Sequence, residues 1–133
     1  MRSVSIILNA FLGLTSIVGG IGLIAGFGAP PLDLLKGSLF GNYFVPGFAL
    51  LIVVGGLASV ATFSLIRGHD RARVFSLLSA AAIVIFEIVE VVSIGSPEGA
   101  ARSLQIVYFS IGILVGVFSL LTKPRHPSQK ASP

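Results

Sequence analysis

Two glutamates, Glu87 and Glu90, have the clearest chemical potential in this chain, because they lie in an otherwise uncharged apolar stretch. Their spacing of three residues places both carboxyl groups on one side of a helix, together with Ala80, Ile83 and Ile94. A carboxylate in apolar surroundings is costly unless it is paired, hydrated or protonated, and two neighbouring carboxylates favour protonation of each other. We therefore expect this face to turn inward and at least one acid to hold a proton near neutral pH.

The surroundings of this acidic pair decide between two interpretations. No lysine or arginine lies within the apolar stretches, so hydrogen bonds or outer-surface groups would have to satisfy the acids. The acids could form a proton or cation site near an outer cavity, or they could serve as hydrogen-bonding contacts between helices, with Glu90 solvated at the mouth. The candidate partners are Asn9, Thr15, Ser16, Thr62, Gln105, Lys36, Asn42 and Arg102.

Other catalytic chemistry has little support in the sequence. The absence of cysteine excludes disulfides, thiolate metal sites and cysteine nucleophiles. No histidine or aspartate lies in an apolar stretch, and no ligand set has the spacing of a zinc or haem site. We predict no enzymatic activity, no metal and no cofactor.

Four apolar segments must position the acids, over residues 4–26, 45–66, 74–94 and 103–122. Each is close to the roughly 20 residues that a helix needs to cross a hydrocarbon core of about 30 Å. A hydrophobic share of 54% with only 11% charged residues agrees with this. We predict an all-α membrane protein, a bundle of four transmembrane helices in one domain over residues 1–122. At about 1.5 Å per residue, the acids would lie in the outer half of the third helix.

The basic residues predict the orientation, since positively charged loops resist translocation. Most would lie on one side of the membrane: Arg2, Arg67, Arg71, Arg73, Lys123, Arg125 and Lys130. Only Lys36 and Arg102 would lie on the other. We predict that both termini are cytoplasmic in a cell membrane, that residues 123–133 form a flexible basic tail, and that nucleic acid is not a partner, because the charge of +4 is explained by topology.

The connection between the first two helices carries an amphipathic pattern. Pro30 and Pro31 can begin a short helix, and Leu32, Leu35 and Leu39 then recur on one side of it. We predict a short amphipathic segment at the outer interface, which could be a surface linker or a lid over the bundle.

Small residues could bring the helices together, because lipid chains give no hydrophobic driving force between them. The predicted packing positions are Gly13, Ser16, Gly20, Gly55, Ser59, Gly112 and Gly116. We expect them to pack within one chain, with homodimerisation as the alternative.

The stretch 37–47 reads GSLFGNYFVPG and resembles a pattern, G-[ST]-x-F-x-x-Y-x-x-P-G, of small uncharacterised four-helix bacterial membrane proteins. The residues that carry it are Gly37, Phe40, Tyr43, Pro46 and Gly47. The resemblance implies a prokaryotic plasma membrane and a glutamate in the third helix, and it implies no activity. Aromatic rings in such a loop prefer the membrane interface.

Two functional hypotheses follow. The first is a structural or accessory subunit of a membrane assembly, held in the bilayer beside a larger membrane protein or a second copy, and it is motivated by the small-residue faces. The alternative is a small proton-coupled or cation transporter or channel that uses Glu87 and Glu90.

Overall fold

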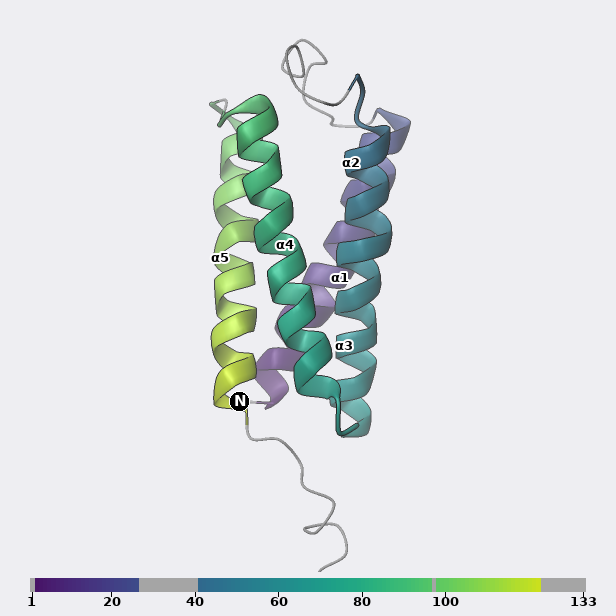
Figure 1. The fold of residues 1–133 in the computed structure, drawn as a ribbon, viewed down its shortest axis with the longest axis vertical. Coiled ribbons are helices and arrows are strands. Elements are labelled where there is room, and N and C mark those ends of the chain that lie inside the picture. The colour runs from purple at the N-terminus through teal and green to yellow at the C-terminus, as the bar shows by residue number, and fades with distance from the viewer. Residues whose placement is uncertain (1, 27–40, 97, 123–133) are drawn as a thin grey trace, which may run out of the picture.

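Four long helical segments lie side by side and alternate in direction (Figure 1). The computed structural model describes residues 2–26, 41–96 and 98–122. The helices are α1 (Arg2–Ala25), a continuous second segment made of α2 (Phe44–Phe48), the π-helical η2 (Ala49–Val54) and α3 (Gly55–Arg67), then α4 (Ala72–Ile94) and α5 (Ala100–Leu121). The predicted segments agree with these bounds to within three residues, and the described part of the chain contains no strand.

All four segments are long and apolar enough to cross a membrane, which confirms the predicted all-helical, four-helix architecture. The side chains that face outward are as apolar as those inside, as Ile7, Phe63 and Val92 illustrate with exposed fractions of 66%, 64% and 82%. A helix that is apolar on every side suits a lipid environment. The predicted interfacial segment and basic tail lie outside the described residues, as do Lys36, Gly37 and Phe40.

The helices form a ring in which α1 and α4 are diagonal to each other. α1 packs against α3 and α5, and α4 packs against the same two helices. The core at the centre consists of Leu12, Leu50, Val54, Ala58, Ala80, Ile83, Ile111 and Val115. Two ends can be distinguished. The basic end, defined by Arg2, Arg67, Arg71 and Arg73, holds the turn between α3 and α4, and the opposite end holds the connection between α4 and α5.

Glycines allow α1 to lie very close to the second segment. A Cβ atom at Gly20 would lie 2.6 Å from the carbonyl oxygen of Gly47, a distance that no side chain can adopt without displacement. Further along the same contact, a Cβ at Gly55 would lie 2.8 Å from Ile17 Cγ1, and one at Gly13 would lie 3.2 Å from Ser59 Oγ. These small residues therefore pack within one chain.

The contact between α4 and α5 uses glycine in the same way. A Cβ at Gly112 would lie 2.8 Å from Ile83 Cγ2 and Val84 Cγ2. Gly116 is less tightly packed, since its Cβ would lie 3.8 Å from that of Ala80. Ser16, on α1, is fully buried and its Oγ has no hydrogen-bond partner.

The π-helical stretch η2 interrupts a segment that the sequence predicts as one plain helix. Positions that face α1 recur every four residues, at Gly47, Leu51, Gly55 and Ser59. In an α-helix of 3.6 residues per turn, a four-residue step rotates by roughly 40° more than one turn, so the row would turn away from α1. A π-helical stretch has more residues per turn and rotates the row back. η2 thereby keeps the glycines in contact with α1.

Candidate functional site: an acidic groove

An apolar groove lies between the second segment and α4, in the half of the molecule where these two diverge (Figure 1). Its volume is about 430 Å³, within the range of roughly 300–1,000 Å³ typical of small-molecule sites. Its walls are formed by Leu23, Tyr43, Val45, Pro46, Ala49, Val53, Val54, Leu78, Ala81, Ala82, Ile85, Phe86, Val89, Glu90, Ser93 and Ile94. We call this feature the groove.

Glu90 is the acidic group of the groove wall. Among the described lining residues, the other polar side chains are Tyr43 and Ser93, and there is no lysine, arginine or histidine. α4 positions Glu90 and Ser93 on neighbouring turns, since they are three residues apart. The groove therefore combines a long apolar surface with one carboxyl group near the end of α4.

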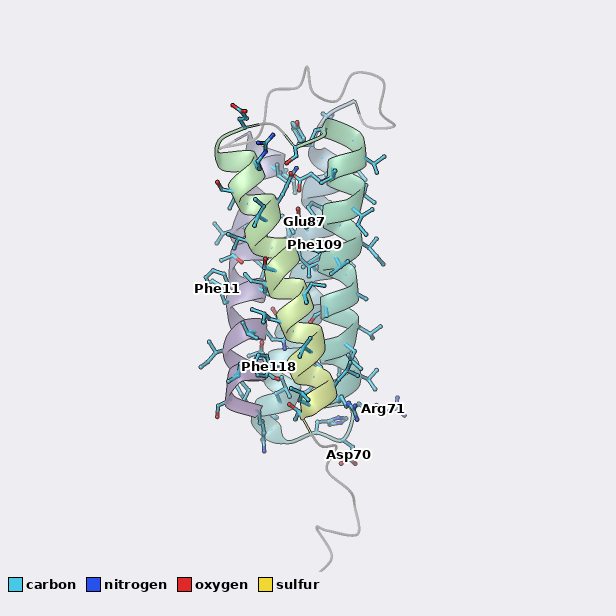
Figure 2. All side chains as sticks on the ribbon, turned by 90° about the vertical axis from the view of Figure 1, so that its left-hand side faces the viewer. Phe11, Asp70, Arg71, Glu87, Phe109 and Phe118 are labelled. Atoms are coloured by element: carbon cyan, nitrogen blue, oxygen red, sulfur yellow. The ribbon has the colours of Figure 1, made fainter. Side chains whose placement is uncertain are left out.

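Glu87 lies one turn deeper, behind the groove wall, and is labelled in Figure 2. Only 3% of its surface is exposed, and its Oε2 has no hydrogen-bond partner. The Glu87 and Glu90 carboxyl groups are close enough to hydrogen-bond to each other. Ala80, Ile83 and Ile94 are buried as well, which confirms the prediction that this face of the third long helix turns inward.

Tyr43 faces Glu90 from the start of the second segment. It precedes α2, in which Pro46 occupies the first turn, where a proline loses no helical hydrogen bond. Tyr43 is buried, with an exposed fraction of 7%. Burial raises the pKa of the Tyr43 phenol, and the nearby Glu90 carboxylate raises it further. Tyr43 and Glu90 both line the groove, so the phenol and the carboxyl group belong to one site.

The predicted polar partners of the acids make other hydrogen bonds. Asn42 Oδ1 accepts from the Phe44 backbone N–H at 3.0 Å, at the start of α2. Thr62 Oγ1 donates to the Ala58 carbonyl of its own helix at 2.7 Å. Gln105 Nε2 donates to the Gly95 carbonyl at 3.0 Å, which joins α5 to the end of α4, while the buried Gln105 Oε1 has no partner.

Two further predicted partners are also occupied elsewhere. Thr15 Oγ1 donates to the Phe11 carbonyl at 2.7 Å, within α1. The Arg102 guanidinium donates twice to the Ser96 carbonyl, from Nε at 3.1 Å and Nη2 at 2.6 Å. Arg102 is exposed and does not line the groove.

Asn9, one of the candidate partners, belongs to a separate polar cluster toward the basic end. Its Nδ2 donates to Ser76 Oγ and to the Ser5 carbonyl, both at 2.9 Å, and its Oδ1 accepts from Ser79 Oγ at 2.7 Å. Ser76 and Ser119 hydroxyls lie 2.5 Å apart and extend the cluster to α5. The hydrogen bonds of Asn9 are therefore made within this cluster.

The sequence contained a signal for this serine–asparagine cluster that hydropathy does not detect. Ser76 and Ser79 are three residues apart, on the face that also carries Ala80 and Ile83. Ser5 and Asn9 are four residues apart on α1, so both pairs could meet across the bundle. Two arginines also join helices at this end. Arg2 Nε on α1 donates to the Leu65 carbonyl of α3 at 2.8 Å, and Arg73 Nη2 on α4 donates to the Leu120 carbonyl of α5 at 3.2 Å.

Among the described residues, no group of three or more histidine, aspartate or glutamate side chains could hold a metal ion. Comparison with protein-family models, with curated proteins and with solved structures finds no match for the chain. The groove and its acids must therefore be interpreted from their own geometry.

Proposed function

We propose that this chain is a multi-pass membrane transporter that exchanges protons for cations at Glu87 and Glu90. It lies in a prokaryotic plasma membrane with both termini cytoplasmic, an orientation supported by the basic residues at one end of the bundle. The groove and the acids then lie in the outer half of the bilayer. A pair of carboxyl groups that shares one proton carries a single charge, and an entering cation can replace that proton without adding net charge to the membrane interior.

One observation carries this proposal: the buried, unpartnered oxygen of Glu87 beside a second acid in a groove wall. Asn9, which joins α1 to α4, has partners at both ends of its amide: Oδ1 accepts from Ser79 Oγ, and Nδ2 donates to Ser76 Oγ and to the Ser5 carbonyl. Glu87 keeps free acceptor capacity, and Glu90 connects it to the groove. Unsatisfied acceptors next to an accessible carboxyl group are suited to a mobile positive charge.

The test is cation-driven proton movement in proteoliposomes that contain a pH-sensitive dye. Gradients of Na⁺, K⁺ and tetraethylammonium are applied in turn, and at least one should drive a proton flux in the opposite direction. Glu87→Gln and Glu90→Gln should each reduce that flux at least tenfold, because the amide cannot release a proton. Glu98→Gln is the matched control, since Glu98 is an exposed acid at the same end of the bundle. Equal flux in all three variants would remove the pair from the mechanism.

An accessory role is the function that the sequence favoured, with transport as its alternative, and it stays a prediction. Its motivation was the small-residue faces, and the structure uses Gly13, Gly20, Gly55 and Gly112 for contacts inside the bundle. A stoichiometric membrane protein recovered in a mild-detergent pulldown, and retained by the Glu90→Gln variant, would favour this role over transport.

A further inference from the structure

The chemistry of the groove wall restricts which cation could occupy it. Most lining residues are aliphatic, and the polar lining groups are Tyr43, Glu90 and Ser93. A small inorganic cation typically needs about six oxygen ligands to replace its hydration shell, more than these side chains supply. A cation with an apolar surface needs no such shell of oxygens. The wall therefore suits a positive charge carried by an apolar body.

Charge complementarity points the same way. Glu90 lines the groove from α4, the Tyr43 phenol faces it from the second segment, and Glu87 lies behind it. Arg102 on α5 is the one described basic residue near this end; its guanidinium donates two hydrogen bonds to the Ser96 carbonyl and does not line the groove. Glu98, beyond α4, is exposed. Of the described residues, the charged group that faces an occupant of the groove is therefore an acid.

Aromatic rings and the π-helical stretch complete the wall. Phe86 and Tyr43 both line the groove, and their ring faces can attract a desolvated cation within about 6 Å. Ala49, Val53 and Val54 of η2 form the facing wall. π-helical stretches inside α-helices occur frequently at functional sites. The irregular part of the second segment thus forms one wall of the groove that Glu90 lines.

We propose that the groove binds one lipophilic monovalent cation, with its apolar body between η2 and α4 and its charge at Glu90. The inference rests on the proposed function and names the substrate class of that site. The groove wall includes outward-facing side chains such as Val53, Ile85 and Val89, so the ligand enters sideways from the bilayer. Because these side chains are aliphatic, the groove accepts apolar bodies of different shapes. The carboxyl group of Glu90, in contrast, requires that the ligand carry a positive charge.

The test is calorimetric binding of tetraphenylphosphonium to the full chain in lipid nanodiscs, with empty nanodiscs subtracted. The wild type should bind one cation per chain, and the neutral triphenylphosphine oxide should bind at least tenfold more weakly. Glu90→Gln should weaken binding of the cation at least tenfold, and Glu98→Gln should leave it unchanged. Ala81→Phe fills part of the groove from an exposed position of α4 and should also weaken binding while keeping the acids.

The outcomes separate this inference from the proposed function. Absence of saturable tetraphenylphosphonium binding, or equal binding of the neutral compound or by Glu90→Gln, would overturn the lipophilic-cation site even if Na⁺ or K⁺ drives proton flux. Binding that depends on Glu90 without any cation-driven flux would support the site and contradict transport. Retained binding by Ala81→Phe, together with loss in Glu90→Gln, would place the cation at the carboxyl group but outside the groove and so overturn the inference.

Discussion

Glu87 differs from the side chains of the Asn9 cluster, because it is a buried acid with an oxygen that has no hydrogen-bond partner. Asn9, Ser76 and Ser79 have reciprocal hydrogen bonds, whereas Glu87 Oε2 has none and the Glu87 carboxyl group meets another acid. An unpartnered buried acceptor is expensive, and its persistence is typical of a site with a ligand or a proton to exchange. Tyr43 lines the same site and precedes the second helical segment, so the ionisation of its phenol can be used to probe the site.

The ionisation of Tyr43 should be displaced to high pH. Burial and the Glu90 carboxylate both oppose the phenolate, so the folded-state pKa is above the ordinary value of 10.0. The unfolded chain then loses this proton first, and the stability associated with the neutral phenol is present below about pH 10 and lost as the pH rises through the higher, folded-state pKa. Absorbance at the phenolate band, compared between wild type and Tyr43→Phe, measures this. Glu90→Gln should move the Tyr43 transition back toward 10, and an unshifted transition in the wild type would contradict the geometry.

The Asn9 cluster should contribute measurably to stability. Asn9→Ala removes three hydrogen bonds that connect α1 to α4 and to its own preceding turn. We expect a loss of about 1–2 kcal/mol in the free energy of unfolding, as for interhelical bonds in membranes. Thr15→Ala is the matched control, because Thr15 bonds only within its own helix. Denaturant titration of the detergent-solubilised chain compares them, and equal losses would mean that the cluster does not join the helices.

The sequence predicts residue-level features unevenly. Burial of Glu87 follows from its spacing with Ala80 and Ile83, because residues three or four apart lie on the same face of a helix. The partners of Asn9 do not follow, since they depend on which helices become neighbours and on their relative register. Serines in an apolar stretch carry little hydropathy signal, although the spacing of Ser76 and Ser79 could have indicated them.

At the scale of the elements, the segments themselves are predictable because hydrophobic length decides them. The π-helical η2 is not predictable in this way, since its cause is a contact with α1 along Gly47, Leu51 and Gly55. The groove was likewise beyond the sequence, because it forms where the second segment and α4 diverge (Figure 1). An acid on α4 becomes part of a site only through that divergence.

Close approach of α1 to the second segment gives a prediction at this scale. Gly20→Ala places a methyl group 2.6 Å from the Gly47 carbonyl and should push the two helices apart, at a cost of about 1–3 kcal/mol in unfolding free energy. Gly56→Ala is the control, since its Cβ would meet nothing within 4 Å and alanine favours helix by up to about 1 kcal/mol. The midpoint temperature of thermal unfolding should therefore fall in Gly20→Ala and rise in Gly56→Ala. An unchanged midpoint in Gly20→Ala would contradict the close contact at Gly20.

At the scale of the whole molecule, the bundle has two unlike halves. The half toward the basic end is joined by the Asn9 cluster and by arginines that bond the last carbonyls of α3 and α5. The other half contains the groove and the acids. A closed half beside an open one is the arrangement expected when one side of a membrane protein is accessible and the other is sealed.

The orientation of these halves can be tested with reporter fusions. A reporter at His69 and one in the tail should both be cytoplasmic, and one near Gly99 should be external, because most Lys and Arg residues lie on the first side. Activity of a periplasmic reporter at His69 would reverse the orientation and place the groove in the inner half of the membrane.

If Glu87 and Glu90 exchange protons for cations, as proposed, the pair gives up a proton when a cation arrives. Infrared difference spectroscopy of the reconstituted chain, recorded on addition of tetraphenylphosphonium, Na⁺ or K⁺, measures this at the carboxyl groups themselves. With the coupling cation, we predict loss of a protonated-carboxyl band and gain of a carboxylate band, both absent in Glu90→Gln and unchanged in Glu98→Gln. If no cation produced carboxyl bands, or if the bands persisted in Glu90→Gln, proton release at the acidic pair would be contradicted.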